Sequence, residues 1–226
     1  MHVDLAAGAA AIADPARAAM LDALLDGAPR SAGSLAREAD VAPSTASHHL
    51  ARLLDAGLVV VEPDGRRRAY RLAGPDVARA LETLAVISPP SAPRTLRRHT
   101  RAEAERAART CYDHLAGVLG VAVCDALLAA GAIVPDGERA YALGPGADAA
   151  FGALGIDLPA RGRRAYARPC LDWTERRPHL AGALGAAIAD AVLARGWVAR
   201  VRGTRALRVT DSGRSGLRSA LSLDAL

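Results

Sequence analysis

Residues 31–72 contain two helical patterns, a tight turn and a β-hairpin, in an order that few folds accommodate. The stretch SAGSLAREA, which begins at Ser31, predicts a short helix, and DVAP predicts a tight turn after it. A second helix is expected from about Ser44 to Ala56, because Ala46, Leu50, Leu53 and Leu54 recur there at helical spacing. The β-forming runs LVVVEP and RRRAYRL then meet across Asp64-Gly65, which is a strong hairpin signal. This order predicts a winged helix-turn-helix.

Helical patterns also flank this segment. PARAAMLDALLD, residues 15–26, begins with proline and predicts a helix with Ala18, Leu21, Leu24 and Leu25 on one face. DVARALETLAVI, residues 76–87, carries a Val77, Leu81 and Leu84 stripe that so small a domain cannot bury, and we interpret it as a dimer helix. SPPSAPR, residues 88–94, resembles a linker. We therefore predict an N-terminal domain over residues 1–90 and a C-terminal domain over residues 94–226.

The second helix of the pair presents a polar outer face. Adjacent helical residues project about 100° apart, so His48 and His49 are poorly placed to bind one metal ion. His48 is better placed to contact DNA bases, whereas His49 lies nearer the buried boundary and suits packing. The sequence contains no Asn or Gln, the residues that recognise adenine through two hydrogen bonds. Part of any sequence preference must therefore come from DNA shape. The predicted DNA contacts are Ser44, Thr45, Ser47, His48, His49 and Arg52, with Arg66, Arg67 and Arg68 of the hairpin on phosphates or in a narrow minor groove. A solvated charge run on an exposed turn is the alternative for the three hairpin arginines.

Residues 13–88 resemble the ArsR/SmtB family of bacterial repressors. The resemblance is carried by DPARAAMLDAL, by SLAREADVAPSTASHHLARLLDAGLV and by DGRRRAYRL. It implies a homodimer that binds a palindromic operator in double-stranded DNA and responds to an effector. Metal sensors of that family often carry cysteines on the helix before the recognition helix, or acids and histidines on the dimer helix. Here GSLAREAD and PDVARALETLAVI contain neither Cys nor His, so we assign no metal site and no cofactor.

The C-terminal half contains an internal repeat. HLAGVLG from His114 and HLAGALG from His179 match at six of seven positions, and each runs 17 residues to a glycine, Gly131 or Gly196. A turn-linked β-run and a short helical segment follow each glycine. We interpret this pattern as a duplication that gives two helix-plus-hairpin units, near residues 111–158 and 176–222. The fold class expected for the whole chain is mainly α with β-hairpin wings.

Three interpretations of the C-terminal chemistry stay open. Cys111 and His114, at i and i+3 of an expected helix, could bind a metal, although equivalent places in a repeat favour a shared structural role for His114 and His179. Cys111 or Cys170 could sense oxidants or electrophiles, whereas Cys124 is expected in the core. A pocket between the two units, lined by aromatic and arginine side chains, would suit a small organic ligand. The candidate effector residues are Cys111, Tyr112, His114, Tyr166, Cys170, Trp173, Arg176, Arg177 and His179.

Composition narrows the class of protein. The formal charge of +5 comes from arginine alone, and it divides into −2 over residues 1–87 (9 Arg, 11 Asp plus Glu) and +7 over residues 88–226 (20 Arg, 13 Asp plus Glu). No apolar run suits a membrane span, no signal peptide is evident, and three scattered cysteines suit a reducing compartment, so we expect a cytoplasmic protein. Phosphate-binding loops and hydrolase motifs are absent from the sequence, which argues against an enzyme. We predict a homodimeric transcriptional repressor released by an effector in the C-terminal domain; the alternative is a scaffold that binds nucleic acid or protein constitutively.

Overall fold

The computed structural model describes residues 4–65, 67–89 and 95–223. It contains two compact units, of which the first ends at Glu82 and the second begins at Thr83. This division falls inside helix α5 (Pro75–Ile87), upstream of the boundary expected at residues 90–94. Of the expected linker, residues 90–94 lie outside the described residues. Among the described residues, no helix combines the length and apolar character needed to cross a membrane.

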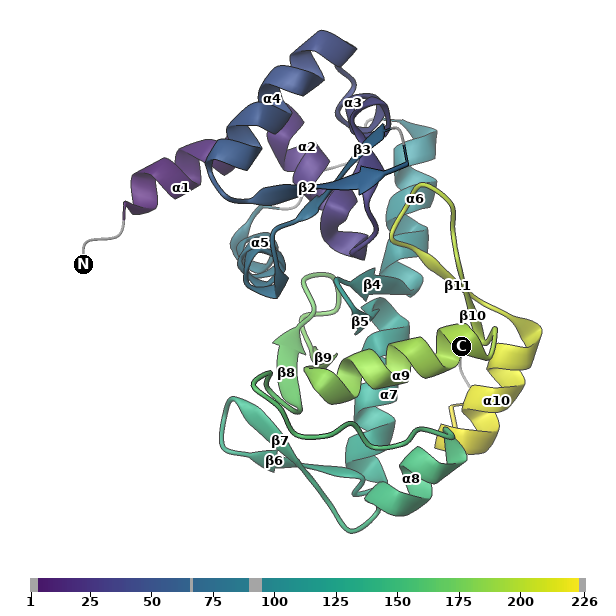
Figure 1. Ribbon diagram of the computed structural model, residues 1–226. Helices are drawn as coiled ribbons and strands as arrows, with labels where there is room; N and C mark the ends of the chain where they lie inside the picture. Colours follow the sequence, from purple (N-terminus) through teal and green to yellow (C-terminus); the bar gives the residue numbers. More distant parts are fainter. Residues whose placement is uncertain (1–3, 66, 90–94, 224–226) are drawn as a thin grey trace. The chain divides into compact units, whose positions relative to one another are not determined.

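The first unit is the predicted winged helix-turn-helix (Figure 1). Its elements are α1 (Leu5–Ile12), α2 (Pro15–Ala23), the 3₁₀ turn η1 (Leu24–Asp26), β1 (Arg30–Ser31), α3 (Ala32–Ala39), α4 (Pro43–Asp55), β2 (Val59–Asp64), β3 (Arg67–Leu72) and the start of α5. The strands form one antiparallel sheet in the order β1-β3-β2. The hairpin and the two helices before it were predicted, whereas α1 and the two-residue strand β1 were not.

The core of the first unit joins α2, α3 and α4. Met20 and Leu21 of α2, Leu35 of α3 and Leu50 of α4 are all fully buried. Ala18, which was expected on the buried face of α2, is exposed.

Arg17 on α2 is buried, and its side chain forms hydrogen bonds with the C-terminal end of α1. Its guanidinium donates from Nε to the carbonyl of Ala11 at 2.6 Å and from Nη2 to the carbonyl of Ala10 at 2.8 Å. Carbonyls in the last turn of a helix lack partners within that helix, so this side chain completes the C-terminus of α1.

The second unit repeats one order of elements twice after helix α6 (Leu96–Ala107). The first set is β4 (Arg109–Cys111), β5 (His114–Ala116), α7 (Gly117–Ala129), β6 (Ile133–Asp136), β7 (Ala140–Leu143) and α8 (Ala147–Ala153). The second set is β8 (Arg168–Leu171), β9 (Pro178–Ala181), α9 (Ala183–Ala194), β10 (Val198–Arg200), β11 (Leu207–Val209) and α10 (Asp211–Leu221). Each set is therefore a hairpin, a helix, a second hairpin and a second helix.

The expectation of two helix-plus-hairpin units was incomplete, because each set begins with an additional hairpin before its long helix. His114 and His179 do not begin helices; each lies on the second strand of a hairpin, and the helix begins only after the following Leu-Ala pair. A glycine enforces the break in each case. Gly117 and Gly182 have φ of 73° and 94°, and a Cβ on Gly117 would lie 2.4 Å from the carbonyl oxygen of Arg106.

One hydrophobic core serves both sets of the second unit. Leu119 and Leu127 of α7 and Phe151 of α8 belong to the same buried cluster as Leu184 and Ile188 of α9. Each long helix also contacts the hairpin of the other set, α7 against β9 and α9 against β5. The two sets are therefore interlocked and fold as one unit.

Candidate functional site

Helix α4 carries a polar outer face opposite its buried side. Ala46, Leu50 and Leu53 are buried against the first unit, which fixes the rotation of the helix about its axis. Ser47 donates its hydroxyl to the carbonyl of Pro43 at 3.0 Å, so this side chain is held against its own helix. The predicted DNA contacts Ser44, Thr45, Ser47, His48 and Arg52 are all exposed on this helix.

The two adjacent histidines of α4 have different surroundings. Their ring centroids lie 6.3 Å apart in an edge-on arrangement. His48 is exposed, whereas His49 is half-buried and its Nδ1 lies 3.7 Å from Oδ1 of Asp14. Asp14 caps the N-terminus of α2, accepting from the backbone N–H groups of Ala16 and Arg17. His49 thus lies between the outer face of α4 and the start of α2.

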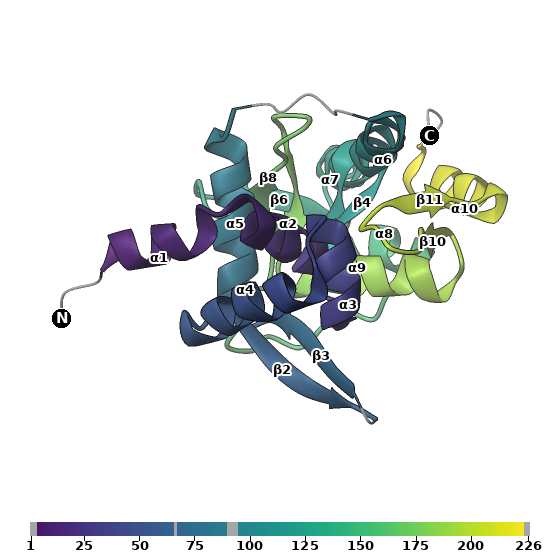
Figure 2. The same ribbon diagram turned by 90° about the horizontal axis from the view of Figure 1, so that it is seen from above.

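The hairpin β2–β3 projects from the helices of the first unit (Figure 2). Val59 pairs with Leu72 at its base and Asp64 with Arg67 at its tip, and Gly65 begins the turn with φ of 59°. Arg68 is exposed on β3. Arg66 lies outside the described residues.

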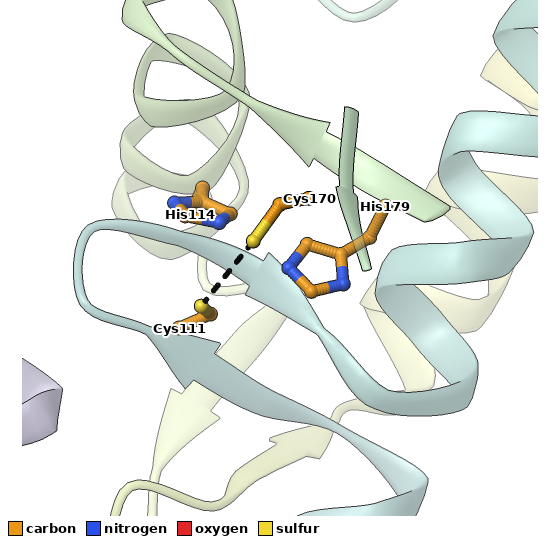
Figure 3. A group of neighbouring side chains, drawn as sticks. All are labelled: Cys111, His114, Cys170 and His179. Carbon is orange, nitrogen blue, oxygen red and sulfur yellow. Dashed lines mark hydrogen bonds between the residues drawn. The ribbon is translucent and has the colours of Figure 1, made fainter. Parts of the chain in front are cut away.

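Two cysteines and two histidines of the second unit converge from two hairpins (Figure 3). Cys111 on β4 is the cross-strand partner of His114 on β5, and Cys170 on β8 is the cross-strand partner of His179 on β9. The expected i, i+3 placement of Cys111 and His114 on a helix is therefore wrong. Directly opposed residues of a hairpin have neighbouring side chains, so each hairpin contributes one adjacent Cys-His pair.

The four side chains form a compact group in which Cys170 alone is partly exposed. Their potential ligand atoms all lie within 4.8 Å of one another, and the two sulfur atoms are 4.0 Å apart. The rings of His114 and His179 have centroids 5.1 Å apart. Cys111, His114 and His179 are 2%, 4% and 0% exposed, which leaves water little access to the group.

An aspartate carboxylate lies next to Nδ1 of each histidine. Nδ1 of His114 lies 3.2 Å from Oδ1 of Asp113, and this carboxylate accepts from Arg164 through Oδ2 at 2.6 Å and through Oδ1 at 3.0 Å. Nδ1 of His179 lies 3.2 Å from Oδ2 of Asp172, close enough for an ion pair although it lacks the alignment of a hydrogen bond. In both hairpins the aspartate follows the cysteine by two positions.

Asp172 is the centre of a buried polar network. Its Oδ2 accepts from Nη2 of Arg109 at 2.9 Å and from the backbone N–H of Gly117 at 2.7 Å. Its Oδ1 accepts from the hydroxyl and the backbone N–H of Thr174 at 2.6 and 2.9 Å. Burial raises the pKa of Asp172, but His179, Arg109, Thr174 and Gly117 together outweigh burial and hold that pKa below the usual range.

The charges around the cluster favour an ionised thiol. Contact with the Cys111 thiol lowers the pKa of Cys170, burial opposes this effect, and the rings of His114 and His179 reinforce it. Burial lowers the pKa of His179, but the neighbouring Asp172 carboxylate and Cys170 thiol outweigh burial and raise it. Cys124 differs, since burial raises the pKa of its thiol to about 11. Its place on the buried side of α7 agrees with the expected core position.

The remaining predicted effector residues do not join this group. Tyr112 lies in the two-residue turn of the first hairpin with φ of 60°. The ring of Trp173 lies 4.8 Å from the guanidinium carbon of Arg109, and the ring of Tyr166 lies 4.8 Å from that of Arg161. The two exposed arginines differ from each other, because Arg177 pairs with Asp125 at 2.9 Å and Arg176 lies in the turn of the second hairpin.

Sequence reasoning missed Asp113, Asp172 and Arg109 as parts of the site. A signal for the two aspartates was present, because Cys-x-Asp precedes each HLAG motif, as CYDHLAG and as CLDWTERRPHLAG. The variable length between Asp and His in the two copies hides this match from a fixed-spacing comparison. Arg109 carries no such signal, since nothing in RAARTCYD marks one arginine for burial.

The last glycine of each repeated motif makes room for the histidine of the other. A Cβ on Gly120 would lie 3.5 Å from Cβ of His179 and 2.5 Å from the carbonyl oxygen of Leu115. A Cβ on Gly185 would lie 3.3 Å from Cβ of His114 and 2.3 Å from the carbonyl oxygen of Leu180. The motif thus supplies a histidine and also the small residue beside its counterpart.

Known proteins are similar to the first unit and, in one case, to nearly the whole chain. A family model described as a helix-turn-helix domain matches residues 12–62. A Bacillus subtilis protein, described as the uncharacterized HTH-type transcriptional regulator YdfF, is 41% identical over 216 residues, which cover 95% of this chain and 95% of that protein. The HTH-type transcriptional regulator CmtR of Mycobacterium tuberculosis is 43% identical over 77 residues, 34% of this chain and 64% of CmtR.

Solved structures are similar to part of this chain. The NMR structure described as the cadmium metal-sensor CmtR of Mycobacterium tuberculosis is 37% identical, covers 40% of this chain and all of that one, and has a TM-score of 0.33. The relatives are transcriptional regulators, in agreement with the expectation of a non-enzymatic protein. The helix-turn-helix match and the full-length similarity to a regulator confirm the resemblance found in the sequence: the chain belongs to the ArsR/SmtB family of winged helix-turn-helix transcriptional regulators.

Proposed function

We propose that the protein is a homodimeric repressor that binds a palindromic operator in double-stranded DNA and is released by an effector acting on its second unit. The observation that carries the proposal is the outer face of α4, which is polar and exposed along its length beside a projecting basic hairpin. In this arrangement α4 enters the major groove and the hairpin follows the phosphate backbone.

Few side chains of α4 can recognise DNA bases. Arg52 can bind guanine through two donors, and His48, Ser44 and Thr45 can each donate or accept one hydrogen bond. Because the chain has no Asn or Gln, the rest of the sequence preference comes from DNA shape and from apolar contact with thymine methyl groups. Arg68 on the hairpin supplies a phosphate contact that does not depend on sequence.

Exposed apolar residues support the dimer. Helix α1 consists of alanine, glycine, leucine and isoleucine, none of its residues is buried, and Leu5 is 80% exposed. On α5, Leu84 and Ile87 are 41% and 77% exposed. A second copy that covers these residues would remove apolar surface from water.

The effector is proposed to act on the second unit. The first unit contains no cysteine, whereas the second holds a buried group of two thiols and two imidazoles with its own supporting carboxylates. Such a group can change charge and geometry when a ligand or an oxidant reaches it.

Titration of DNA across a range of salt concentrations tests the DNA-binding proposal. Arg68→Ala should weaken binding to operator and to unrelated DNA alike, and should reduce the salt slope by about 1, because one phosphate contact is lost. Arg52→Ala should instead reduce discrimination between the two DNAs. Arg139→Ala is the matched control, because Arg139-Ala-Tyr on the β6–β7 hairpin repeats Arg68-Ala-Tyr, and it should bind as the parent does.

If Arg52→Ala and Arg68→Ala both leave affinity and discrimination unchanged, α4 and the hairpin do not contact DNA. The competing function is a constitutive scaffold, favoured by the excess of arginine in the second half of the chain. Weakening by Arg139→Ala alone, with binding insensitive to oxidants, metals and organic ligands, would support that scaffold instead.

A further inference from the structure

We propose that Cys111, His114, Cys170 and His179 bind one Zn²⁺ ion, which fastens the two hairpin-helix sets of the second unit to each other. The proposal goes beyond operator binding and does not depend on it. It assigns a ligand of a specific class to the buried group of the second unit.

The donor set and its spacing suit a tetrahedral ion. Two thiolates and two imidazoles are a ligand set typical of structural zinc sites. With Zn–S bonds of about 2.3 Å, two sulfurs of a tetrahedron lie about 3.8 Å apart. Here they lie 4.0 Å apart, and all four donor atoms fall within 4.8 Å of one another. A disulfide would need its sulfur atoms at about 2.05 Å.

The histidines present unpartnered nitrogens to the group. Nε2 of His114 and Nε2 of His179 are buried and lack a hydrogen-bond partner among the described residues, whereas each Nδ1 lies 3.2 Å from an aspartate oxygen. An uncompensated buried ring nitrogen costs free energy unless something binds it. A carboxylate behind Nδ1 fixes the tautomer that leaves Nε2 free to bind a metal, and it raises the basicity of the ring.

The surrounding charges are already balanced. Asp113 is paired with Arg164 and Asp172 with Arg109, so neither carboxylate needs the ion as its partner. Two thiolates and a divalent cation add to zero charge, which suits a group from which water is largely excluded. The same charge count disfavours a site built for a monovalent ion.

The topology indicates a structural ion. Each set contributes one Cys and one His from a single hairpin, so one ion joins β4–β5 to β8–β9. Four protein ligands fill a tetrahedral shell and leave no open position for a substrate. The glycines at 120 and 185 bring each helix against the histidine of the other set, which places all four ligands at one point.

Metal content of the full chain is the first test. Protein purified under reducing conditions and dialysed against dilute ZnCl₂ should hold one Zn²⁺ per chain by elemental analysis. Cys170→Ser and His179→Ala should hold less than a tenth of that amount. The matched controls Cys124→Ser and His99→Ala, which alter residues outside the group, should still hold one ion.

A second test uses the unaltered chain, so that it does not depend on whether a variant folds. Bound Zn²⁺ should protect Cys111 and Cys170 from alkylation, and removal of the ion by a chelator should expose both to the reagent, as read by peptide mass spectrometry. Co²⁺ in place of Zn²⁺ should give the visible absorption of a tetrahedral thiolate site.

Three results would overturn the proposal. They are less than a tenth of an ion per reduced chain in excess Zn²⁺, equal alkylation of the two thiols with and without the metal, or a Cys111–Cys170 disulfide that persists under mild reductant. None of these measurements involves DNA, so a failure here is separate from a failure of operator binding.

Discussion

Arg109 carries a full positive charge at a position with no exposure to water. Its guanidinium binds Asp172 at 2.9 Å and the carbonyl of Glu105 at 3.2 Å, and its carbon lies 4.8 Å from the centre of the Trp173 ring. Removing one member of a buried ion pair leaves the other charged and unsolvated, whereas an exposed pair loses little when it is broken. The single side chain of Arg109 therefore supports the carboxylate that orients His179.

We expect Arg109→Met to lower the free energy of unfolding of the second unit by about 3–5 kcal/mol, because Asp172 would lose its buried partner. Arg177→Met is the matched control, since Arg177 forms an ion pair with Asp125 at the surface, and it should change stability by less than about 1 kcal/mol. Urea denaturation followed by circular dichroism measures both. Equal effects of the two substitutions would contradict the buried role of Arg109.

Asp113 gives a second prediction at this scale. Asp113→Asn should weaken Zn²⁺ binding about 10- to 100-fold, since the carboxylate next to Nδ1 of His114 orients the ring. The helical content should not change, which separates positioning from folding. Asp136→Asn, on an exposed strand residue away from the cluster, is the control and should leave the affinity as it is. Competition with a coloured zinc chelator reports the affinity, and an Asp113 variant that binds as the parent does would remove the carboxylate from the site.

Among the elements, local patterns of sequence determined what could be predicted. Helix α4 was expected from Ser44 to Ala56 and spans Pro43–Asp55, because its apolar spacing and its flanking Pro and Gly are local signals. The Asp-Gly turn gave the β2–β3 hairpin in the same way. Strand β1 has only two residues, whose pairing with β3 depends on tertiary contacts that no local pattern records.

The candidate site was predicted less well for a physical reason. Cys111, His114, Cys170 and His179 were all named from the sequence, but as separate alternatives. Their convergence depends on two short hairpins, and the three-residue strands β4 and β5 are too short to show alternation. The repeated HLAG was interpreted as a helix start because the left-handed φ of Gly117 and Gly182, which separates strand from helix, is invisible in the sequence.

The packing of helix against opposite hairpin gives a prediction for the element scale. Gly185→Ala should destabilise the second unit and weaken Zn²⁺ binding, because the new Cβ would lie 2.3 Å from the carbonyl oxygen of Leu180 and 3.3 Å from Cβ of His114. In Gly152→Ala on α8 the new Cβ would meet no atom of the described residues within 4 Å, so this variant should be neutral or stabilise by up to about 1 kcal/mol. Thermal melts of the zinc-loaded proteins compare the two. A Gly185 variant as stable as the Gly152 variant would show that the interlocked packing tolerates movement.

For the molecule as a whole, the proposed dimer would connect DNA binding to the exposed apolar surface. A palindromic operator offers two half-sites, and one chain occupies only one of them. Coupling the two sites multiplies affinity, because the second contact becomes intramolecular once the first is made. Helix α5 is the element whose exposed Leu84 and Ile87 best account for the expected interface.

We therefore expect the double variant Leu84→Asp, Ile87→Asp to sediment as a monomer, since two carboxylates would have to be buried without partners to form the dimer. Its affinity for a palindromic operator should fall at least tenfold, while its affinity for a single half-site should change little, because α4 and the hairpin are untouched. Leu158→Asp is the control, an exposed leucine that is 36% accessible between α8 and β8, and it should remain dimeric. If the α5 variant stays dimeric and Leu158→Asp becomes monomeric, the dimer forms through the segment between α8 and β8 and not through α5. In that case the hairpin-helix sets that we propose to be joined by zinc would also set the spacing of the two DNA-binding units.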